Sequence, residues 1–178
     1  MVIVKAENDQ YEAVRSFYHS MIDAIAGGTV YVGWKKDVYP SPALLSDSIN
    51  SGELYLALDG SVIVAAMICN NKCNEGYAKC RWQVNADASE VMVIHALGVH
   101  PDHQGRGYAK ALVEYALDIA GKSGMKAVRL DVIEGNLPAE KLYSCYGFRY
   151  MDTQQMFYAD TGWTSFMLYE RQLSADGV

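Results

Sequence analysis

The 178-residue sequence predicts an α+β fold built around a mostly antiparallel sheet. In the first half of the chain, Asp59-Gly60 joins two apolar runs and gives a strong hairpin signal. The second half instead alternates the patterns of strand, helix, strand, helix and strand. The length and the 51% hydrophobic content are sufficient for one core, so we expect a single domain over residues 1–178.

Three strands and two helices are expected before residue 70. Asn8 or Asp9 can cap the first helix, which carries its apolar residues on one side and stops at Gly27-Gly28. Ser41-Pro42 supplies an N-cap and a first-turn proline for the second helix. The expected strands are Val2–Lys5, Glu53–Leu58 and Ser61–Cys69, and the two helices end near Ile25 and Ile49.

The remaining chain predicts four more strands and two more helices by the same criteria. The segment Asn70–Glu90 is expected to be a loop, although Trp82 and Val84 leave a further strand open. Pro138 is compatible with the last helix because it lies in the first turn, after Asn136 as the cap. The expected strands are Val91–Val99, Ala127–Ile133, Gly147–Tyr158 and Thr164–Glu170, with helices from Gly107 to Ala120 and from Asn136 to Tyr146.

A glycine turn joins the strand Val91–Val99 to the helix that follows it. The first amides of a helix have no intrahelical partner, and the helix dipole adds about half a positive charge there. Gly105 and Gly107 allow positive φ and let an anion approach the main chain, and Arg106 can add charge from the side. The turn therefore predicts a phosphate or pyrophosphate site at Gly105 to Ala109, with a merely structural tight turn as the alternative.

Two sequence blocks resemble the GNAT N-acetyltransferase superfamily. Gln104-Gly105-Arg106-Gly107-Tyr108-Ala109 resembles its Gln/Arg-x-x-Gly-x-Gly/Ala loop, and Leu97-Gly98-Val99-His100-Pro101 precedes it as the usual strand end. Residues 136–148 resemble its Asn-x-x-Ala-x-x-Leu-Tyr-x-x-x-Gly-Phe segment. The resemblance covers roughly the C-terminal half of the chain. It implies the GNAT fold, a mixed, mostly antiparallel central sheet of about six to seven strands flanked by about four helices.

The same resemblance implies acetyl-CoA as the cosubstrate. In the GNAT fold the strands that end here at Val99 and Ile133 splay apart, and the pantetheine arm lies in the gap. The pyrophosphate would rest on the glycine turn, and the main chain of Leu97 and Val99 would bond the arm. The residues implied in cofactor binding are Leu97, Gly98, Val99, Gln104, Gly105, Arg106, Gly107, Tyr108, Ala109, Asn136 and Tyr143.

Candidate catalytic groups follow for direct transfer of acetyl to an amine. By the resemblance, Tyr143 would protonate the departing thiolate, and a core position is its alternative. The amide near Leu97 would stabilise the oxyanion. If strand alternation holds, His95 shares a face with Leu97 and Val99 and is a candidate base; a satisfied, partly buried histidine is the alternative. Glu90 is the nearest carboxylate.

The acceptor is expected to be a primary amine of a small molecule or a peptide, and its identity stays open. Trp34, Tyr39 and Trp82 are candidates for an acceptor pocket because aromatic faces attract ammonium groups, and core packing is the alternative. Two competing interpretations are a GNAT-fold protein that binds acyl-CoA without catalysis and an interaction module whose glycine loop is purely structural. A homodimer is left open.

Composition narrows the partners and the location. The net charge of -6 argues against nucleic acid and anionic membranes as the main partners, since both select basic surfaces. The N-terminus lacks the apolar core of a signal peptide, and no apolar run approaches the length of a membrane span. Cys69, Cys73, Cys80 and Cys145 match no zinc spacing, so we expect reduced cysteines, no metal and a cytoplasmic protein.

Overall fold

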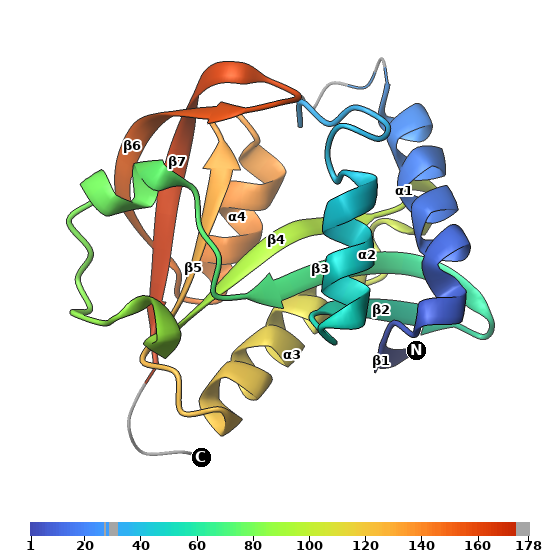
Figure 1. Ribbon diagram of the computed structural model, residues 1–178, viewed down its shortest axis with the longest axis horizontal. Helices are drawn as coiled ribbons and strands as arrows, with labels where there is room; N and C mark the ends of the chain where they lie inside the picture. The colour runs from blue at the N-terminus through green and yellow to red at the C-terminus, as the bar shows by residue number, and fades with distance from the viewer. Residues whose placement is uncertain (27, 29–31, 174–178) are drawn as a thin grey trace.

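The computed structural model describes residues 1–26, 28 and 32–173. Gly27, the first residue of the predicted helix stop Gly27-Gly28, lies outside the described residues. Within these residues the chain forms a seven-stranded sheet in the order β1-β2-β3-β4-β5-β7-β6, together with four α-helices (Figure 1). Neighbouring strands are antiparallel except β4 and β5, which are parallel. The predicted α+β class and the mostly antiparallel sheet are confirmed.

The predicted elements form with small shifts at their ends. The strands are β1 (Val2–Lys5), β2 (Leu54–Asp59), β3 (Val62–Asn70), β4 (Val91–Val99), β5 (Ala127–Ile133), β6 (Arg149–Tyr158) and β7 (Gly162–Gln172). The helices are α1 (Tyr11–Ile25), α2 (Pro42–Asn50), α3 (Tyr108–Lys122) and α4 (Leu137–Cys145). Residues 71–90, all of them described, contain two short 3-10 turns and no strand, so the further strand left open at Trp82 and Val84 is not formed.

The helices cover the two faces of the sheet in pairs. One core cluster packs α3 and α4 on strands β2 to β5, around Leu112, Val113 and Tyr143. A second cluster packs α1 and α2 on the opposite face, around Val14 and Tyr18. Each helix is amphipathic and places its apolar stripe against the sheet, which is the main source of its stability. Strand β4 therefore lies in the middle of the sheet, with α3 on one face and α1 on the other (Figure 1).

The parallel strands β4 and β5 pair over only a short stretch. Their register runs from Val91 opposite Ala127 to Val93 opposite Arg129, and it ends there. Beyond that point β5 pairs only with β7, as far as Ile133. The facing edges of β4 and β5 therefore leave a gap in the sheet, which is the geometry that the GNAT resemblance implies.

β4 contains a bulge at Ala96, beside this gap. Its register against β3 moves from Ile68 opposite His95 to Ala66 opposite Gly98, so β4 holds one extra residue. Ala96 has a φ of 48°, in the left-handed region that non-glycine residues seldom adopt. Because side chains alternate along a strand, one extra residue inverts the faces of all residues that follow it.

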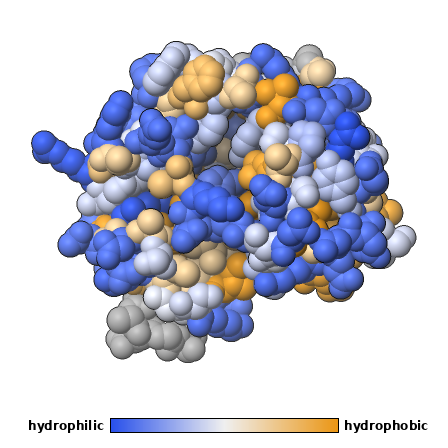
Figure 2. Space-filling view, viewed as in Figure 1, coloured by the Kyte–Doolittle hydropathy of each residue, from blue (hydrophilic) through white to orange (hydrophobic). Residues whose placement is uncertain are grey.

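The surface is mostly polar, and hydrophilic side chains cover most of the face seen in Figure 2. The larger apolar side chains that are exposed include Tyr150, Phe157 and Trp163 on β6 and β7. No helix in the described part of the chain is long and apolar enough to cross a membrane.

Candidate active site

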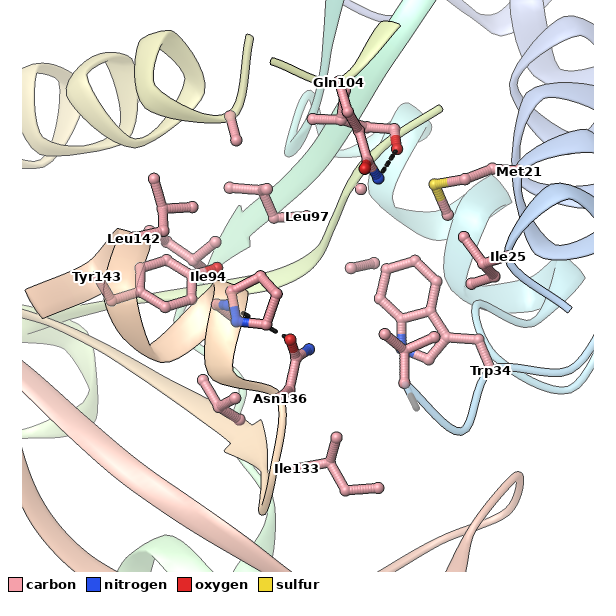
Figure 3. A pocket seen from close by; sticks show the side chains of 18 of the residues that line it. Met21, Ile25, Trp34, Ile94, Leu97, Gln104, Ile133, Asn136, Leu142 and Tyr143 are labelled. Atoms are coloured by element: carbon pink, nitrogen blue, oxygen red, sulfur yellow. Dashed lines mark hydrogen bonds between the residues drawn. The ribbon is translucent and has the colours of Figure 1, made fainter. Parts of the chain in front are cut away.

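A cavity of about 880 Å³ occupies the gap between β4 and β5. Met21, Ile25 and Trp34 face Leu142 and Tyr143 across it (Figure 3). Of the predicted site residues, all of which the structure describes, only Arg106 and Trp82 lie outside the lining. Those that line the cavity are Trp34, Tyr39, His95, Leu97, Gly98, Val99, Gln104, Gly105, Gly107, Tyr108, Ala109, Asn136 and Tyr143.

The glycine turn forms one end of the cavity. Gly105 has a φ of 77° and Gly107 a φ of 86°, so both need the freedom of glycine. Gly107 caps α3, and the unpaired first amides of that helix follow it. A Cβ built on either glycine would have no described heavy atom within 4 Å, so the main chain faces open space. An anion can therefore approach these amides without displacing a side chain.

Two side chains hold this turn in place. The Tyr108 ring is 7% exposed, and its hydroxyl donates to the Asp59 carboxylate at 2.9 Å. The Gln104 amide donates to the Val99 carbonyl at 3.4 Å (Figure 3). Tyr108 and Gln104 thus tie the turn to the ends of β2 and β4, and the main chain is left to contact a ligand.

Helix α1 packs directly on the bulged part of β4. Tyr18 is 1% exposed, and its hydroxyl donates to the Ala96 carbonyl at 2.8 Å. A Cβ on Gly98 would lie 2.6 Å from the Met21 sulfur, so a side chain at this position would require Met21 to move. The register gives Leu97 no partner residue in β3 or β5. Leu97 therefore lies at the bulge and lines the cavity.

The bulge moves His95 away from the face predicted for it. Leu97 and Val99 pack with the cluster under α3 and α4, whereas His95 lies opposite Ile68, on the face covered by α1 and α2. The expectation that His95 shares a face with Leu97 and Val99 is wrong, because the extra residue in β4 inverts the alternation. The His95 Nε2 is hydrogen-bonded to the Asn70 Oδ1 at 3.0 Å. Burial lowers the pKa of His95 to about 4, which keeps the imidazole neutral.

Tyr143 projects from α4 into the cavity (Figure 3). Its ring is 7% exposed and packs edge-on against Phe148, with 5.5 Å between centroids. Burial, with a further contribution from the charge of Asp131, raises the pKa of its phenol, so the hydroxyl keeps its proton at neutral pH. Asn136 accepts a hydrogen bond from the Ala139 amide at 3.3 Å, and this cap fixes the start of α4. The Tyr143 ring is thus packed against Phe148 on one side, and the residue lines the cavity.

The opposite end of the cavity has an aromatic wall, made of Trp34, Tyr39, Tyr158 and Phe166. Ring centroids lie 5.7 Å apart for Trp34 and Tyr39, 6.1 Å for Tyr39 and Tyr158, and 4.9 Å for Tyr158 and Phe166. Tyr158 and Phe166 come from the β6–β7 hairpin, whose tip lies beside the segment before α2 (Figure 1). The wall thus joins the predicted pair, Trp34 and Tyr39, to a distant part of the chain.

Trp82 is not part of this wall. Its ring centroid lies 4.2 Å from the Arg129 guanidinium carbon, and its indole N–H donates to the Tyr77 carbonyl at 2.9 Å. Arg129 in turn pairs with Glu170 at 2.9 Å. The indole therefore covers a buried ion pair and lines a separate, smaller cavity of about 300 Å³.

Two lining carboxylates were not among the predicted site residues. Asp131 on β5 accepts hydrogen bonds from the hydroxyls of Tyr77 at 2.8 Å and Tyr158 at 3.1 Å. Asp160, in the turn between β6 and β7, is 4% exposed and accepts from the Thr161 amide at 3.0 Å. Burial raises the pKa of both carboxyls. The signal for Asp131 was a charge that alternates with apolar residues in a buried strand; nothing local distinguishes Asp160 from an ordinary turn residue.

Comparison with known families identifies the family of the chain. The profile of the Acetyltransferase (GNAT) family matches residues 15–148, which include the bulge, the glycine turn and Tyr143. The chain belongs to the GNAT acetyltransferase family. Members of this family use acetyl-CoA, so the predicted resemblance and the predicted acetyltransferase class are confirmed.

Individual relatives agree over shorter or more divergent matches. An uncharacterized N-acetyltransferase of Methanocaldococcus jannaschii is 39% identical over 69 residues, which is 39% of this chain but only 30% of the length of that relative. A GNAT-family acetyltransferase of Streptococcus agalactiae has a TM-score of 0.78 at 15% identity, with 97% of this chain and 95% of that one covered. The structure of yncA from Salmonella typhimurium with its cofactor acetyl-CoA has a TM-score of 0.70 at 16% identity, covering 100% and 96%. At these identities the two structures show the GNAT fold.

Proposed function

We propose that the protein transfers the acetyl group of acetyl-CoA to a primary amine of a small molecule or a peptide, by direct attack in a ternary complex. The observation that carries the proposal is one cavity that joins the glycine turn, Tyr143 and the aromatic wall. We call the stretch Leu97–Ala109 with Asn136 the donor half, and the aromatic wall with its two carboxylates the acceptor half. Because the residues that line the cavity extend along the chain from Met21 to Phe166, we also propose that residues 1–178 act as one domain.

The donor half fits coenzyme A. The amides from Gly105 to Ala109 would hold the pyrophosphate at the positive end of α3, with Arg106 adding charge from outside the lining. The unpaired edge of β4 at Leu97 and Val99 would bond the pantetheine amides as an added strand does. Both contacts use main-chain groups, which the turn and the bulge already orient.

Acetyl transfer needs an oxyanion donor and a proton for the departing thiolate. By the family resemblance, the Leu97 amide would donate to the oxyanion, and Leu97 lies at the bulge and lines the cavity. Tyr143 would give its proton to the thiolate. Its raised pKa keeps the phenol protonated at neutral pH, so a proton is in place when the thiolate departs.

The attacking amine must also lose a proton. Asp131 lines the same cavity as Tyr143, and its charge contributes to the raised pKa of Tyr143, so the two groups lie near each other. His95, the predicted base, is bonded to Asn70 on the face covered by α1. We therefore favour Asp131 over His95 as the group that receives the proton.

The test is thiol release from acetyl-CoA with a panel of primary amines, with the acetylated product identified by mass spectrometry. Amine-dependent thiol release is the expected result. Coenzyme A binding in calorimetry without thiol release for any amine would indicate the non-catalytic acyl-CoA-binding protein instead. Absence of coenzyme A binding would leave only the interaction module. The cytoplasmic location and the homodimer stay predictions, to be checked by cell fractionation and light scattering.

A further inference from the structure

Two carboxylates line the acceptor half without a cationic partner. Among the described residues, neither Asp131 nor Asp160 forms an ion pair with Lys or Arg within 4.0 Å. Their hydrogen-bond donors are the neutral hydroxyls of Tyr77 and Tyr158 for Asp131 and one backbone amide for Asp160. Burial raises the pKa of the Asp160 carboxyl and the charge of Lys35 lowers it by less, so Lys35 lies in its neighbourhood, but Lys35 does not line the cavity. Neither carboxylate is therefore held in a salt bridge by the described part of the chain.

Glu170 is a buried carboxylate outside the cavity, and it has a full set of partners. It is 3% exposed, pairs with Arg129 at 2.9 Å, and accepts from the amides of Gln83 and Val84 at 2.9 and 3.0 Å. A buried carboxylate is costly unless it is paired in this way. Asp131 and Asp160 lack that pairing, and both line the cavity. A bound cation would therefore supply the missing ion-pair partner.

The aromatic wall points independently to a cation. Burial raises the pKa of Tyr39, and the charges of Asp131 and Asp160 add to the rise, so both carboxylates lie near this ring. The faces of Trp34, Tyr39 and Tyr158 attract ammonium groups, most strongly where water is excluded.

The cations of the lining lie elsewhere. Lys110 and Lys141 line the cavity from α3 and α4, the two helices that begin at the donor half. The part of the acceptor half that the structure describes contributes no Lys or Arg to the lining. An acceptor with a carboxylate near its amine would therefore meet two acidic side chains and no cationic side chain in the described lining of this half.

We propose that the acceptor is a small dication of the alkyl diamine class, with its reacting ammonium at Asp131 and its second cationic group at Asp160. This inference rests on the proposed acetyl transfer and names its substrate class. Asp131 accepts one ammonium proton, and the nitrogen lone pair then forms the C–N bond to the thioester carbonyl carbon. The nitrogen loses a second proton to solvent as the C–S bond breaks. The bonding electron pair stays on sulfur, which takes the Tyr143 proton, and both side chains regain their starting states by exchange with solvent.

A matched set of acceptors tests the class on the wild-type protein. 1,4-Diaminobutane, butylamine and 4-aminobutyrate share an alkyl amine and end in an ammonium, a methyl and a carboxylate. We expect kcat/KM to fall at least about tenfold from the diamine to butylamine, and further for 4-aminobutyrate, since charge-assisted contacts are the strong ones. Acceptor chains shorter and longer by one methylene give the spacing.

A pair of variants locates the second charge. Asp160→Asn should raise KM for 1,4-diaminobutane about tenfold and leave KM for butylamine and for acetyl-CoA unchanged. Asp118→Asn, which removes the same charge from the exposed face of α3, should change none of these values. Calorimetry of 1,4-diaminobutane with coenzyme A present should show the same loss for Asp160→Asn without any turnover.

The outcomes distinguish failure of the dicationic acceptor class from failure of acetyl transfer itself. Equal kcat/KM for the diamine and butylamine, or a preference for 4-aminobutyrate, would overturn the dicationic class while acetyl transfer stands. If acetyl-CoA binds and no amine releases thiol, acetyl transfer itself fails and the dicationic acceptor fails with it. If Asp160→Asn does not fold, the wild-type acceptor series still decides the class.

Discussion

The donor half and the acceptor half of the cavity are built in different ways. The donor half comes mainly from one stretch, Leu97–Ala109, joined by Asn136, and its glycines open the main chain of the turn to a ligand. The acceptor half is assembled from side chains of the segment before α2, of β5 and of the β6–β7 hairpin. Main-chain recognition depends on local backbone conformation, whereas side-chain recognition depends on which distant segments meet. We therefore expect glycine changes to impair the donor half and side-chain changes to impair the acceptor half.

Substitution of Tyr143, at the boundary between the two halves, should have the largest effect on activity. Tyr143→Phe keeps the ring packed against Phe148 and deletes only the proton. We expect kcat to fall by roughly 10² or more, within the usual range for general acid catalysis, with acetyl-CoA affinity nearly intact. Steady-state kinetics under conditions where chemistry limits the rate, together with calorimetry, measure both quantities.

Tyr146→Phe is the matched control for this variant. Tyr146 follows the same helix, but its hydroxyl donates to Glu114 at 2.7 Å at the exposed surface. Its loss should leave kcat unchanged. A folded Tyr143→Phe protein with wild-type kcat would mean that water or another group protonates the thiolate and that Tyr143 is only a packing residue.

The next test separates Asp131 from His95 as the proton acceptor. Burial raises the pKa of Asp131 above the ordinary 3.8, so kcat/KM should fall as the pH drops through that raised pKa and the carboxylate becomes protonated. Asp131→Asn should lower kcat by roughly 10² and remove this acid limb. His95 titrates at about 4, so His95→Gln should leave the limb in place.

The pH profiles of kcat/KM for both variants decide between the two groups. Loss of the acid limb in His95→Gln, with the limb retained in Asp131→Asn, would restore His95 as the base. Retention of the limb in both variants would assign it to a group of the substrate.

A third test addresses the donor half alone. Gly107→Glu forces a side chain into the left-handed region and places a carboxylate before the amides that would hold the pyrophosphate. We expect the Kd of coenzyme A to rise at least about tenfold, which corresponds to a loss of about 1.4 kcal/mol of binding free energy. Gly124→Glu is the control, because Gly124 has a φ of 70°, faces open space and lies beyond the far end of α3.

Both glycine variants carry the same kind of strain and the same charge. An equal loss of coenzyme A affinity in the two would indicate a general effect on the fold. An unchanged affinity in folded Gly107→Glu would remove the turn from the site.

The donor half was predictable because its determinants are local. Gly105 and Gly107 lie between an apolar strand and an amphipathic helix, and their conformation follows from the lack of a Cβ. The same holds for Asn136, whose capping role depends on residues within one turn. The residue pattern therefore predicted the α+β class and the glycine turn, and the family resemblance implied the rest of the donor half.

The acceptor half was only partly predictable because its determinants are distant. The face of His95, the predicted base, was missed for the same reason. Strand alternation fails at Ala96, whose carbonyl accepts a hydrogen bond from Tyr18 of helix α1. Asp160 reaches the cavity only because the β6–β7 hairpin folds over it. Neither event leaves a mark in the neighbouring sequence.

The two tryptophans provide the smallest effect and the sharpest test of the aromatic wall. Trp34 lines the cavity 5.7 Å from Tyr39, whereas Trp82 stacks 4.2 Å from the Arg129 guanidinium carbon outside it. Trp34→Ala should raise KM for every active amine several-fold, consistent with about 0.5–2 kcal/mol for a cation over an aromatic face, and leave KM for acetyl-CoA unchanged. Trp82→Ala deletes the same side chain and should lower the melting temperature without changing either KM. If Trp34→Ala leaves acceptor KM unchanged for all active amines, Trp34 is core packing for Tyr18 and Gly98, and the acceptor half is smaller than we propose.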